Sequence, residues 1–239
     1  MKYLISNLKS NKTLEEIICF ENKIKKIKTN LNLIICPSHP YYLSFTSDNY
    51  ILGAQDISRK KGGAYTGEVN GIQLANLNVK YVLVGHSERR ECFKETEKTF
   101  KKKIKHALEN NIKVIYCIGE TKEENLRQKT YVVLEKQLAT VLNEFTKDEL
   151  KDIIIAYEPI WAINSDDIPN TNELTEIFTF IKKLVKQYYE VDIEVVYGGS
   201  CNEKTIEELV KIENIDGILV GNASLEADNL IKIIKKLQK

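Results

Sequence analysis

The chain has 239 residues, 43% of them hydrophobic, and its 35 Lys and Arg nearly balance its 34 Asp and Glu, for a formal net charge of +1. This composition supports a large buried core, and the near-zero net charge excludes a strong electrostatic field that would attract nucleic acids or membrane surfaces. No apolar run reaches membrane-spanning length, and the first apolar stretch is too short for a signal peptide. The chain has five cysteines without a C-x-x-C pair and three histidines that lie well apart, which predicts neither a disulfide framework nor a metal site. Free thiols are typical of a reducing cytoplasm, where we expect this soluble chain to lie.

Eight short runs, most of them continuously apolar, predict β-strands that are buried on both faces. The runs are Tyr3–Leu8, Leu31–Cys36, Tyr50–Ala54, Lys80–Val84, Lys113–Ile118, Asp152–Tyr157, Ile193–Tyr197 and Gly217–Val220. Amphipathic stretches separate them, and no linker or shift in composition marks a domain boundary. This order predicts an α/β fold, a single (β/α)8 TIM barrel spanning residues 1–239. A doubly wound open sheet is the weaker alternative, because no G-x-G-x-x-G follows the first run.

The stretches between the runs carry the sequence signals of helices. Capping boxes are predicted at Thr13–Glu16, Thr121–Glu124 and Thr146–Glu149. Apolar residues between positions 174 and 188 recur every three or four residues. The lysines at 101–103 fall inside a helical stretch and are expected on a solvated face. In a barrel the carboxyl ends of the strands form the active face, so polar residues there are the candidates for a site.

Polar residues end the first and fourth predicted strands. Asn7 and Lys9 are alternate residues and are expected to project to the same side, where the lysine would attract an anion. An exposed strand-end lysine is the alternative. A helix beginning just after His86 would direct free backbone N–H groups at the imidazole and favour its neutral form. The alternative there is a buried histidine with a structural role.

The sixth run ends in Glu158, which is followed by Pro159 and by Trp161, the only tryptophan of the chain. Proline restricts the residue before it to extended geometry, so the direction of the carboxylate is set. A carboxylate at an apolar rim suits a base that works near neutral pH. The alternative is a buried ion pair with Lys9.

Small residues end the last two predicted strands. The turns Gly198-Gly199-Ser200 and Gly221-Asn222-Ala223-Ser224 would let backbone N–H groups converge on an anion, and a short helix can add its N-terminus. Many barrels bind phosphate at these two loops. A third loop, residues 57–69, is long and without a clear period, which in a compact domain is typical of a functional loop.

Several segments stand in the order and at the spacing of one family: GAYTGEV, GHSERR, AYEPIWAI, YGGS and DGILVG. On these segments the chain resembles the triosephosphate isomerase family along its whole length. The resemblance implies a cytoplasmic homodimer of TIM barrels that interconverts dihydroxyacetone phosphate and D-glyceraldehyde 3-phosphate in glycolysis and gluconeogenesis. It implies an enediolate intermediate, and neither a cofactor nor a metal.

The resemblance also implies roles for individual residues. Glu158 matches the base, His86 the neutral electrophile, Lys9 the cation that draws in the substrate, and Asn7 the side chain beside it. The positions that match phosphate-binding residues are Asn164, Ser200, Gly221 and Asn222. Thr66 matches the tip of a loop, here residues 57–69, that reaches into a partner subunit beside its catalytic residues. Supporting positions near the site are matched by Glu88, Arg89 and Cys117.

The stretch after Ile163 departs from the family pattern. The family usually has Gly-Thr-Gly-Lys and a small hinge residue there, whereas this chain reads Asn164-Ser165-Asp166-Asp167-Ile168-Pro169. Two carboxylates on a lid that closes near a phosphate dianion, and a proline that stiffens the hinge, predict altered lid motion and weaker phosphate binding with the chemistry intact. Asn222 likewise replaces a glycine of the family.

Two other functions fit parts of this pattern. Another phosphate-binding barrel, such as an epimerase or a synthase of tryptophan or histidine biosynthesis, would keep the glycine turns but does not explain Asn7, Lys9, His86 and Glu158 together. A divergent dimer used for binding or scaffolding is supported only by the lid. Activity on glyceraldehyde 3-phosphate distinguishes the three.

Overall fold

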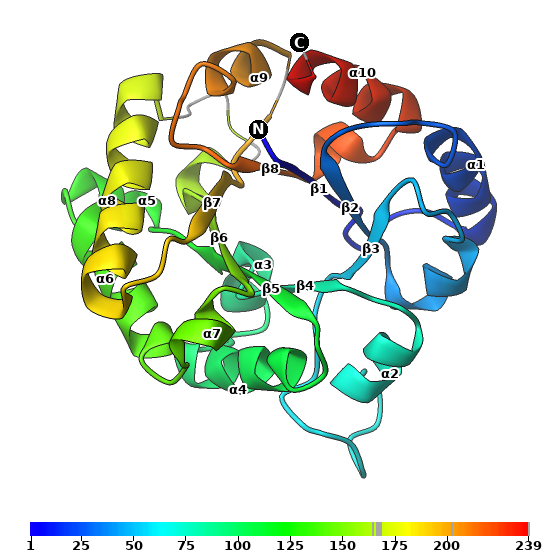
Figure 1. Cartoon of the computed structure of the whole chain (residues 1–239), viewed down its shortest axis with the longest axis horizontal. Helices are drawn as coiled ribbons and strands as arrows, with labels where there is room; N and C mark the ends of the chain where they lie inside the picture. The colour runs from blue at the N-terminus through cyan, green and yellow to red at the C-terminus, as the bar shows by residue number, and fades with distance from the viewer. Residues whose placement is uncertain (164, 166–168, 202, 239) are drawn as a thin grey trace.

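The strands of the chain close into a barrel (Figure 1), and the computed structural model describes residues 1–163, 165, 169–201 and 203–238. Every strand is parallel to its neighbours, and β8 pairs with β1. The strands are β1 (Tyr3–Asn7), β2 (Asn32–Cys36), β3 (Ile51–Ala54), β4 (Tyr81–Val84), β5 (Lys113–Ile118), β6 (Ile153–Tyr157), β7 (Glu194–Tyr197) and β8 (Gly217–Val220). The predicted eight strands and the TIM barrel are confirmed, and the open sheet is wrong.

Helices surround the barrel (Figure 1). They are α1 (Leu14–Ile24), η1 (His39–Ser44), α2 (Gly71–Asn76), α3 (Ser87–Glu91), α4 (Glu97–Leu108), α5 (Lys122–Leu126), α6 (Thr130–Leu142), α7 (Lys147–Leu150), η2 (Ile160–Ala162), α8 (Thr171–Tyr189), α9 (Glu203–Leu209), η3 (Asn222–Ser224) and α10 (Ala227–Leu237), where η marks a 3-10 helix. The three predicted capping boxes are present at the starts of α1, α5 and α7. Asn70 and Asn170 form two more, at α2 and α8, because an asparagine oxygen caps as well as a hydroxyl.

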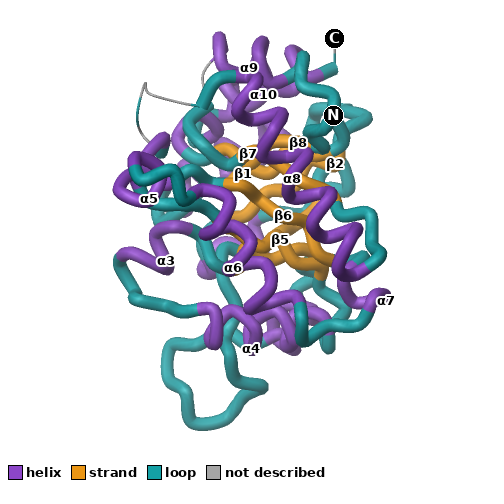
Figure 2. Tube along the Cα trace, turned by 90° about the vertical axis from the view of Figure 1, so that its left-hand side faces the viewer, coloured by secondary structure: helices purple, strands orange, loops and turns teal. Residues whose placement is uncertain are grey.

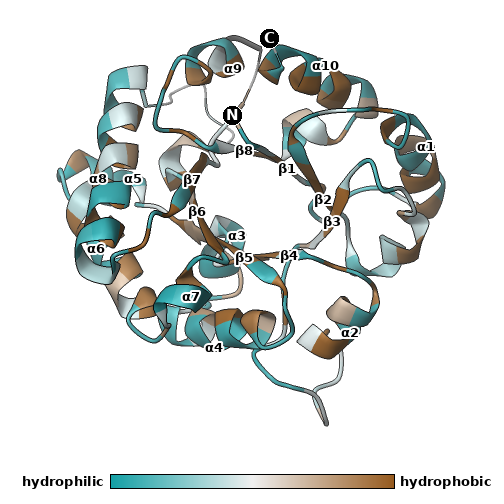
Figure 3. Cartoon of the chain, in the orientation of Figure 1, coloured by the Kyte–Doolittle hydropathy of each residue, from teal (hydrophilic) through white to brown (hydrophobic). Residues whose placement is uncertain are grey.

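Strand residues alternate between the barrel interior and the helices. Ile5, Ile115 and Ile154 belong to the inner cluster, whereas the adjacent Leu4 and Val114 pack in the outer layer against the helices. The helices turn apolar sides toward the strands, as α10 shows clearly (Figure 3). Both faces of each strand are therefore buried, which explains the continuous apolar runs.

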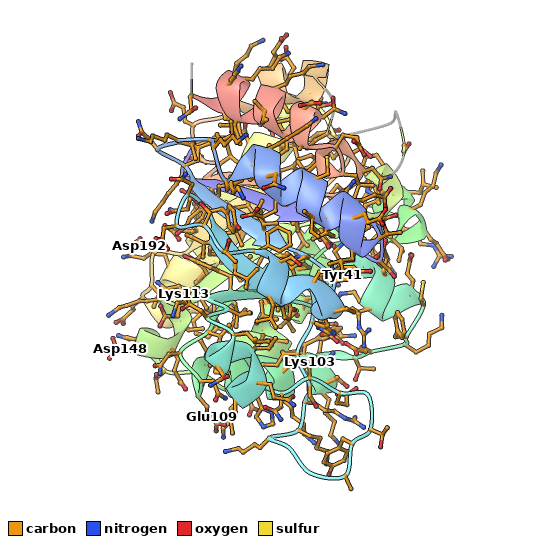
Figure 4. The ribbon with its side chains drawn as sticks, turned by 90° about the vertical axis from the view of Figure 1, so that its right-hand side faces the viewer. Tyr41, Lys103, Glu109, Lys113, Asp148 and Asp192 are labelled. Carbon is orange, nitrogen blue, oxygen red and sulfur yellow. The ribbon has the colours of Figure 1, made fainter. Side chains whose placement is uncertain are left out.

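Two expectations about helix faces are wrong. Lys103 of α4 is 3% exposed, because its ammonium group lies 2.6 Å from Asp56 and 2.7 Å from Glu95. The two carboxylates compensate its burial, and Figure 4 shows Lys103 in the body of the molecule near the base of the projecting loop. Tyr188, the last member of the apolar series in α8, is 63% exposed, since the helix ends at the next residue.

The two ends of the barrel are easily told apart. Lys113, Asp148 and Asp192 lie at one end, where strands begin, and Tyr41, which follows β2, lies toward the other (Figure 4). In the view of Figure 2, α3 and α5 lie at the end where strands finish, and α7 lies at the opposite end. In the part of the chain that the structure describes, no helix is long and apolar enough to cross a membrane.

Candidate active site

A pocket of about 540 Å³, counted with its open mouth, lies where the strands end. Six of the predicted residues line the pocket, and they end or follow strands β1, β4, β7 and β8. These residues are Asn7, Lys9, His86, Ser200, Gly221 and Asn222. Glu158 adjoins the pocket through His86 and Gly198. Asn164 lies outside the described residues. The barrel thus gathers side chains that are up to 215 positions apart in the chain, from Asn7 to Asn222.

Glu158 continues the inward-facing series of β6, which includes Ile154 and Ala156. It is 2% exposed, and its Oε2 accepts a hydrogen bond from the backbone N–H of Ser87 at 3.0 Å. Among the described residues no donor reaches its Oε1, which lies 3.7 Å from Nε2 of His86. One carboxylate oxygen is therefore held in place while the other keeps its lone pairs free.

His86 stands at the N-terminus of α3, as the sequence predicted. Its Nδ1 accepts the backbone N–H of Glu88 at 3.3 Å. An acceptor at Nδ1 fits the imidazole tautomer that carries its proton on Nε2. The imidazole therefore presents an N–H donor toward the pocket and Glu158.

The turn that carries His86 is held by a partly buried guanidinium. Arg90 donates to the carbonyl of Gly85 at 2.8 Å and to the carbonyl of Cys117 at 2.9 Å, which ties the end of β4 to that of β5. Gly85 has φ of 80°, a left-handed conformation that favours glycine. These contacts fix the direction in which α3 starts, and with it the position of the imidazole.

Lys9 reaches the pocket by a route that the sequence did not predict. Its φ of 51° is left-handed, so the alternation of a strand no longer applies after Asn7. The conformation is held from both sides of the peptide: the Lys9 N–H donates to Oδ1 of Asn7 at 3.0 Å, and the Lys9 carbonyl accepts from Ser38 at 2.8 Å and Gln55 at 2.7 Å. Its ammonium group pairs with Glu88 at 2.7 Å, so the predicted alternative of a Lys9–Glu158 ion pair is wrong.

The anion side of the pocket is built from the turns after β7 and β8. The short helix η3 begins at Asn222, immediately after Gly221, and so directs backbone N–H groups to this end of the barrel. A Cβ at Gly221 would lie 3.0 Å from Cε of Lys9, so the glycine leaves the lysine stem its path into the pocket. Ser200 contributes a hydroxyl from the opposite turn. A cation, a hydroxyl and the start of a short helix suit a small anion.

Two glycines that pack against Glu158 were not recognised as site residues. A Cβ at Gly198 would lie 2.7 Å from Cγ of Glu158, and one at Gly119 would collide with the Glu158 carbonyl oxygen. The sequence showed Gly198 only as part of an anion-binding turn. Its packing role depends on how close β6 and β7 come at their ends.

Glu120 was also missed, although it follows β5 where polar residues were sought. It is fully buried, and its carboxylate accepts from Nε1 of Trp161 at 2.8 Å and from the hydroxyl of Tyr157 at 3.1 Å. Burial raises the pKa of Glu120, and these hydrogen bonds oppose that shift. Glu120 therefore anchors the indole just before the segment that the sequence predicts to be a lid.

The loop 57–69 projects from the barrel (Figures 1 and 2), and Thr66 in it is exposed. Its base is closed by a hydrogen bond from the Ser58 N–H to the Val69 carbonyl at 2.8 Å. Thr66 does not line the pocket of its own chain. Among the residues that the structure describes, no group of three or more His, Cys, Asp or Glu is placed to hold a metal ion.

A closed parallel barrel that places a buried carboxylate, a neutral imidazole and a lysine beside an anion-sized pocket defines an α/β-barrel enzyme that acts on a small anionic substrate. The family model of triosephosphate isomerase matches residues 2–237. The triosephosphate isomerases of Endomicrobium trichonymphae and Mycoplasmopsis pulmonis are 37% and 38% identical to the chain, and the alignments cover 97% of it and 97% and 96% of the relatives. That of Clostridium tetani is 37% identical, covering 97% of the chain and 94% of the relative. The chain belongs to the triosephosphate isomerase family.

Proposed function

We propose that Glu158 and His86 carry out the family's reaction in this chain, the interconversion of dihydroxyacetone phosphate and D-glyceraldehyde 3-phosphate. The observation that carries this proposal is Oε1 of the buried Glu158, which accepts no hydrogen bond from the described residues and lies 3.7 Å from Nε2 of His86. A base and a donor on the two sides of one small gap suit the transfer of a proton between adjacent carbons while the neighbouring oxygen gains charge.

The proposed steps follow from this geometry. Glu158 Oε1 takes a proton from the carbon beside the substrate carbonyl, and the electron pair of that C–H bond moves to the carbonyl oxygen as the enediolate forms. His86 Nε2–H and the ammonium group of Lys9 stabilise this oxygen charge, and Asn7 lies beside them. The proton then returns from Glu158 to the adjacent carbon, while the hydroxyl proton of the other oxygen moves to the oxygen that gained charge, so a new carbonyl and a new hydroxyl form and nothing is consumed. One well-placed donor contributes about 10²–10³ in rate, and a positioned base roughly 10²–10⁴.

Phosphate binding is proposed at the turns after β7 and β8. Ser200, Gly221 and Asn222 line the pocket there, and we propose that Asn164 adds its backbone N–H. The phosphate is remote from the reacting carbons, so its binding energy can hold the lid closed over the enediolate. Because Asp166 and Asp167 add negative charge to this lid, we expect slower closing and a higher KM than the common lid sequence would give. Relaxation measurements that found ordinary closing rates would contradict this expectation.

The proposed assembly is a homodimer of single-domain barrels in the cytoplasm. Its support is the projecting loop 57–69, whose exposed Thr66 has no role in its own pocket. Thr66→Arg should convert the dimer to monomers in sedimentation velocity and lower kcat, because the tip would be too large for the partner's site. Sedimentation as a monomer by the unaltered chain would refute the dimer.

A coupled assay with glyceraldehyde 3-phosphate tests the reaction, run on the unaltered chain, Glu158→Gln and, as a matched control, Glu135→Gln on the exposed side of α6. We expect Glu158→Gln to lower kcat by roughly 10²–10⁴ and Glu135→Gln to leave it unchanged. A folded Glu158→Gln variant with full activity would refute the role of the base. If the unaltered chain were inactive but still bound phosphate, the proposed enzymatic function would be wrong and a binding function would take its place.

A further inference from the structure

Two buried serines are joined behind the anion side of the pocket. Ser6 of β1 and Ser224 of η3 are both 0% exposed, and the Ser6 hydroxyl donates to Oγ of Ser224 at 2.8 Å. Because β1 and β8 are paired neighbours (Figure 1), this bond ties one strand to the turn that follows the other. Neither serine lines the pocket. Any effect of the pair on a bound anion must therefore pass through the turn itself.

The Ser6 hydroxyl lies on an otherwise apolar part of the barrel wall. Ser6 alternates with Leu4 and Leu8, which are both fully buried in the outer layer. A hydroxyl in such surroundings costs free energy unless it is hydrogen-bonded, and an alanine would avoid this cost. Among the described residues the partner of this hydroxyl is Ser224 alone. Its presence is therefore better explained by its effect on Ser224 than by packing in the core.

Ser224 passes the contact on to the turn after β8. Its hydroxyl donates to the Gly221 carbonyl at 2.8 Å, with the Val220 carbonyl as a longer second acceptor at 3.2 Å. The Gly221 carbonyl also accepts the backbone N–H of Ser224 at 2.8 Å. Since a hydroxyl has one proton to donate and lone pairs to accept, the two serines form a directed chain of hydrogen bonds that ends on Gly221.

The direction of the Gly221 carbonyl sets the direction of a neighbouring donor. The peptide bond that carries this carbonyl also carries the N–H of Asn222, and in a trans peptide the two groups point in opposite directions. A carbonyl that is held toward the buried Ser224 therefore turns the Asn222 N–H to the other side of the peptide. Gly221 and Asn222 both line the pocket. The serine chain thus controls how this backbone donor is presented.

We propose that Ser6 and Ser224 are positioning residues for the substrate's phosphate group, because their hydrogen bonds aim the Asn222 N–H at it; this inference rests on the phosphate site proposed above. The peptide adjoins the cation of the pocket, since a Cβ on Gly221 would lie 3.7 Å from Nζ of Lys9. An ammonium group and an aimed N–H suit one anion, and hydrogen bonds to a charged acceptor are the strong ones. Neither serine reaches the reacting carbons, so both act on affinity and not on the chemistry.

Serine-to-alanine variants test this inference through the affinity for inorganic phosphate, measured by phosphorus NMR titration at constant ionic strength. Ser224→Ala should weaken phosphate binding and raise the KM for glyceraldehyde 3-phosphate by the same factor, about fivefold, with kcat within about twofold, since part of one hydrogen bond to a charged group is lost. Ser6→Ala should act in the same direction. Because Ser6 acts through Ser224, the double variant should bind phosphate as Ser224→Ala does. D-Glyceraldehyde, which has no phosphate, should react equally with all of them.

Thr130→Val is the matched control, because it removes a buried hydroxyl at the start of α6, outside the pocket, and should leave phosphate affinity and KM unchanged. Unchanged phosphate affinity in Ser224→Ala would overturn the inference. So would additive effects in the double variant, a fall in kcat at constant KM, or an equal change in the control. If Ser224→Ala does not fold, Ser6→Ala decides by the same affinity. A chain without isomerase activity would refute the proposed reaction instead, and the phosphate titration would still decide on the serines.

Discussion

Gly198→Ala tests how narrowly the position of Glu158 is set. The added methyl carbon would lie 2.7 Å from Cγ of Glu158, 3.4 Å from Oε1 and 3.5 Å from Cδ. Carbon atoms rest about 3.5–4.0 Å apart, so the side chain must move by about 1 Å. A misplacement of this size costs on the order of 10² in rate, which corresponds to about 2.7 kcal/mol of transition-state stabilisation. We therefore expect kcat to fall about 100-fold.

The assay is steady-state isomerisation, with Ser200→Ala as the contrasting variant. Ser200 lines the same turn but contributes to the anion side, so its loss should raise KM and leave kcat largely intact. Both variants should unfold near the midpoint of the unaltered chain, because neither disturbs a strand. A Gly198→Ala enzyme with kcat within about threefold of the unaltered chain would show that Glu158 tolerates displacement, and would refute the reasoning from 1 Å shifts.

Three further results are expected. Lys103→Met should lower the free energy of unfolding in urea by roughly 3 kcal/mol, because it removes a buried cation and leaves Asp56 and Glu95 to share the guanidinium of Arg89. Lys101→Ala, which breaks an exposed pair, should cost less than about 1 kcal/mol, and equal costs would contradict this. Burial raises the pKa of Glu120 above its unfolded value of about 4.3, so the contribution of this carboxyl group to stability declines as pH rises from about 4 through the folded pKa. The free energy of unfolding of Glu120→Gln, relative to that of the unaltered chain, should therefore increase over that pH range. A difference that does not change with pH in urea titrations would refute this. A thiol reagent at neutral pH should modify the exposed Cys19 and Cys92 quickly and the other three cysteines slowly. Burial raises the pKa of the Cys201 thiol to about 12 and also raises the pKa values of Cys36 and Cys117, so few of these thiols are ionised. Rapid reaction of all five cysteines would contradict this.

The strands were predictable because their environment is simple. A parallel strand inside a barrel is covered on both faces, so nearly every residue of β5 and β6 is apolar, and the predicted bounds of these strands fall within one residue of the observed ones. Glu158 was predictable for the same reason. It is the first charged residue after an apolar run, and Pro159 signals that the strand has ended.

Features that depend on distant partners could not be predicted in this way. Lys103 has the sequence context of a surface residue, and only the fold brings Asp56 and Glu95 to it. The left-handed turn at Lys9 depends on Ser38 and Gln55, which donate to its carbonyl from after β2 and β3. In each case the local sequence is compatible with several conformations, and hydrogen bonds across the barrel select one.

The proposed catalytic residues and the proposed lid depend on different contacts, so one can change without the other. Among the described residues, Glu158 is positioned by Ser87 and by Gly119 and Gly198, and His86 by the start of α3, all of which lie outside the segment between Ile163 and Pro169. The lid segment is anchored before it begins, where Trp161 donates to Glu120. We therefore expect a substitution between Ile163 and Pro169 to act on closing of the proposed lid and on phosphate affinity, and to leave Glu158 and His86 in place. Unusual lid residues such as Asp166 and Asp167 are on this argument compatible with a working isomerase, and their effect belongs in KM and in lid rates.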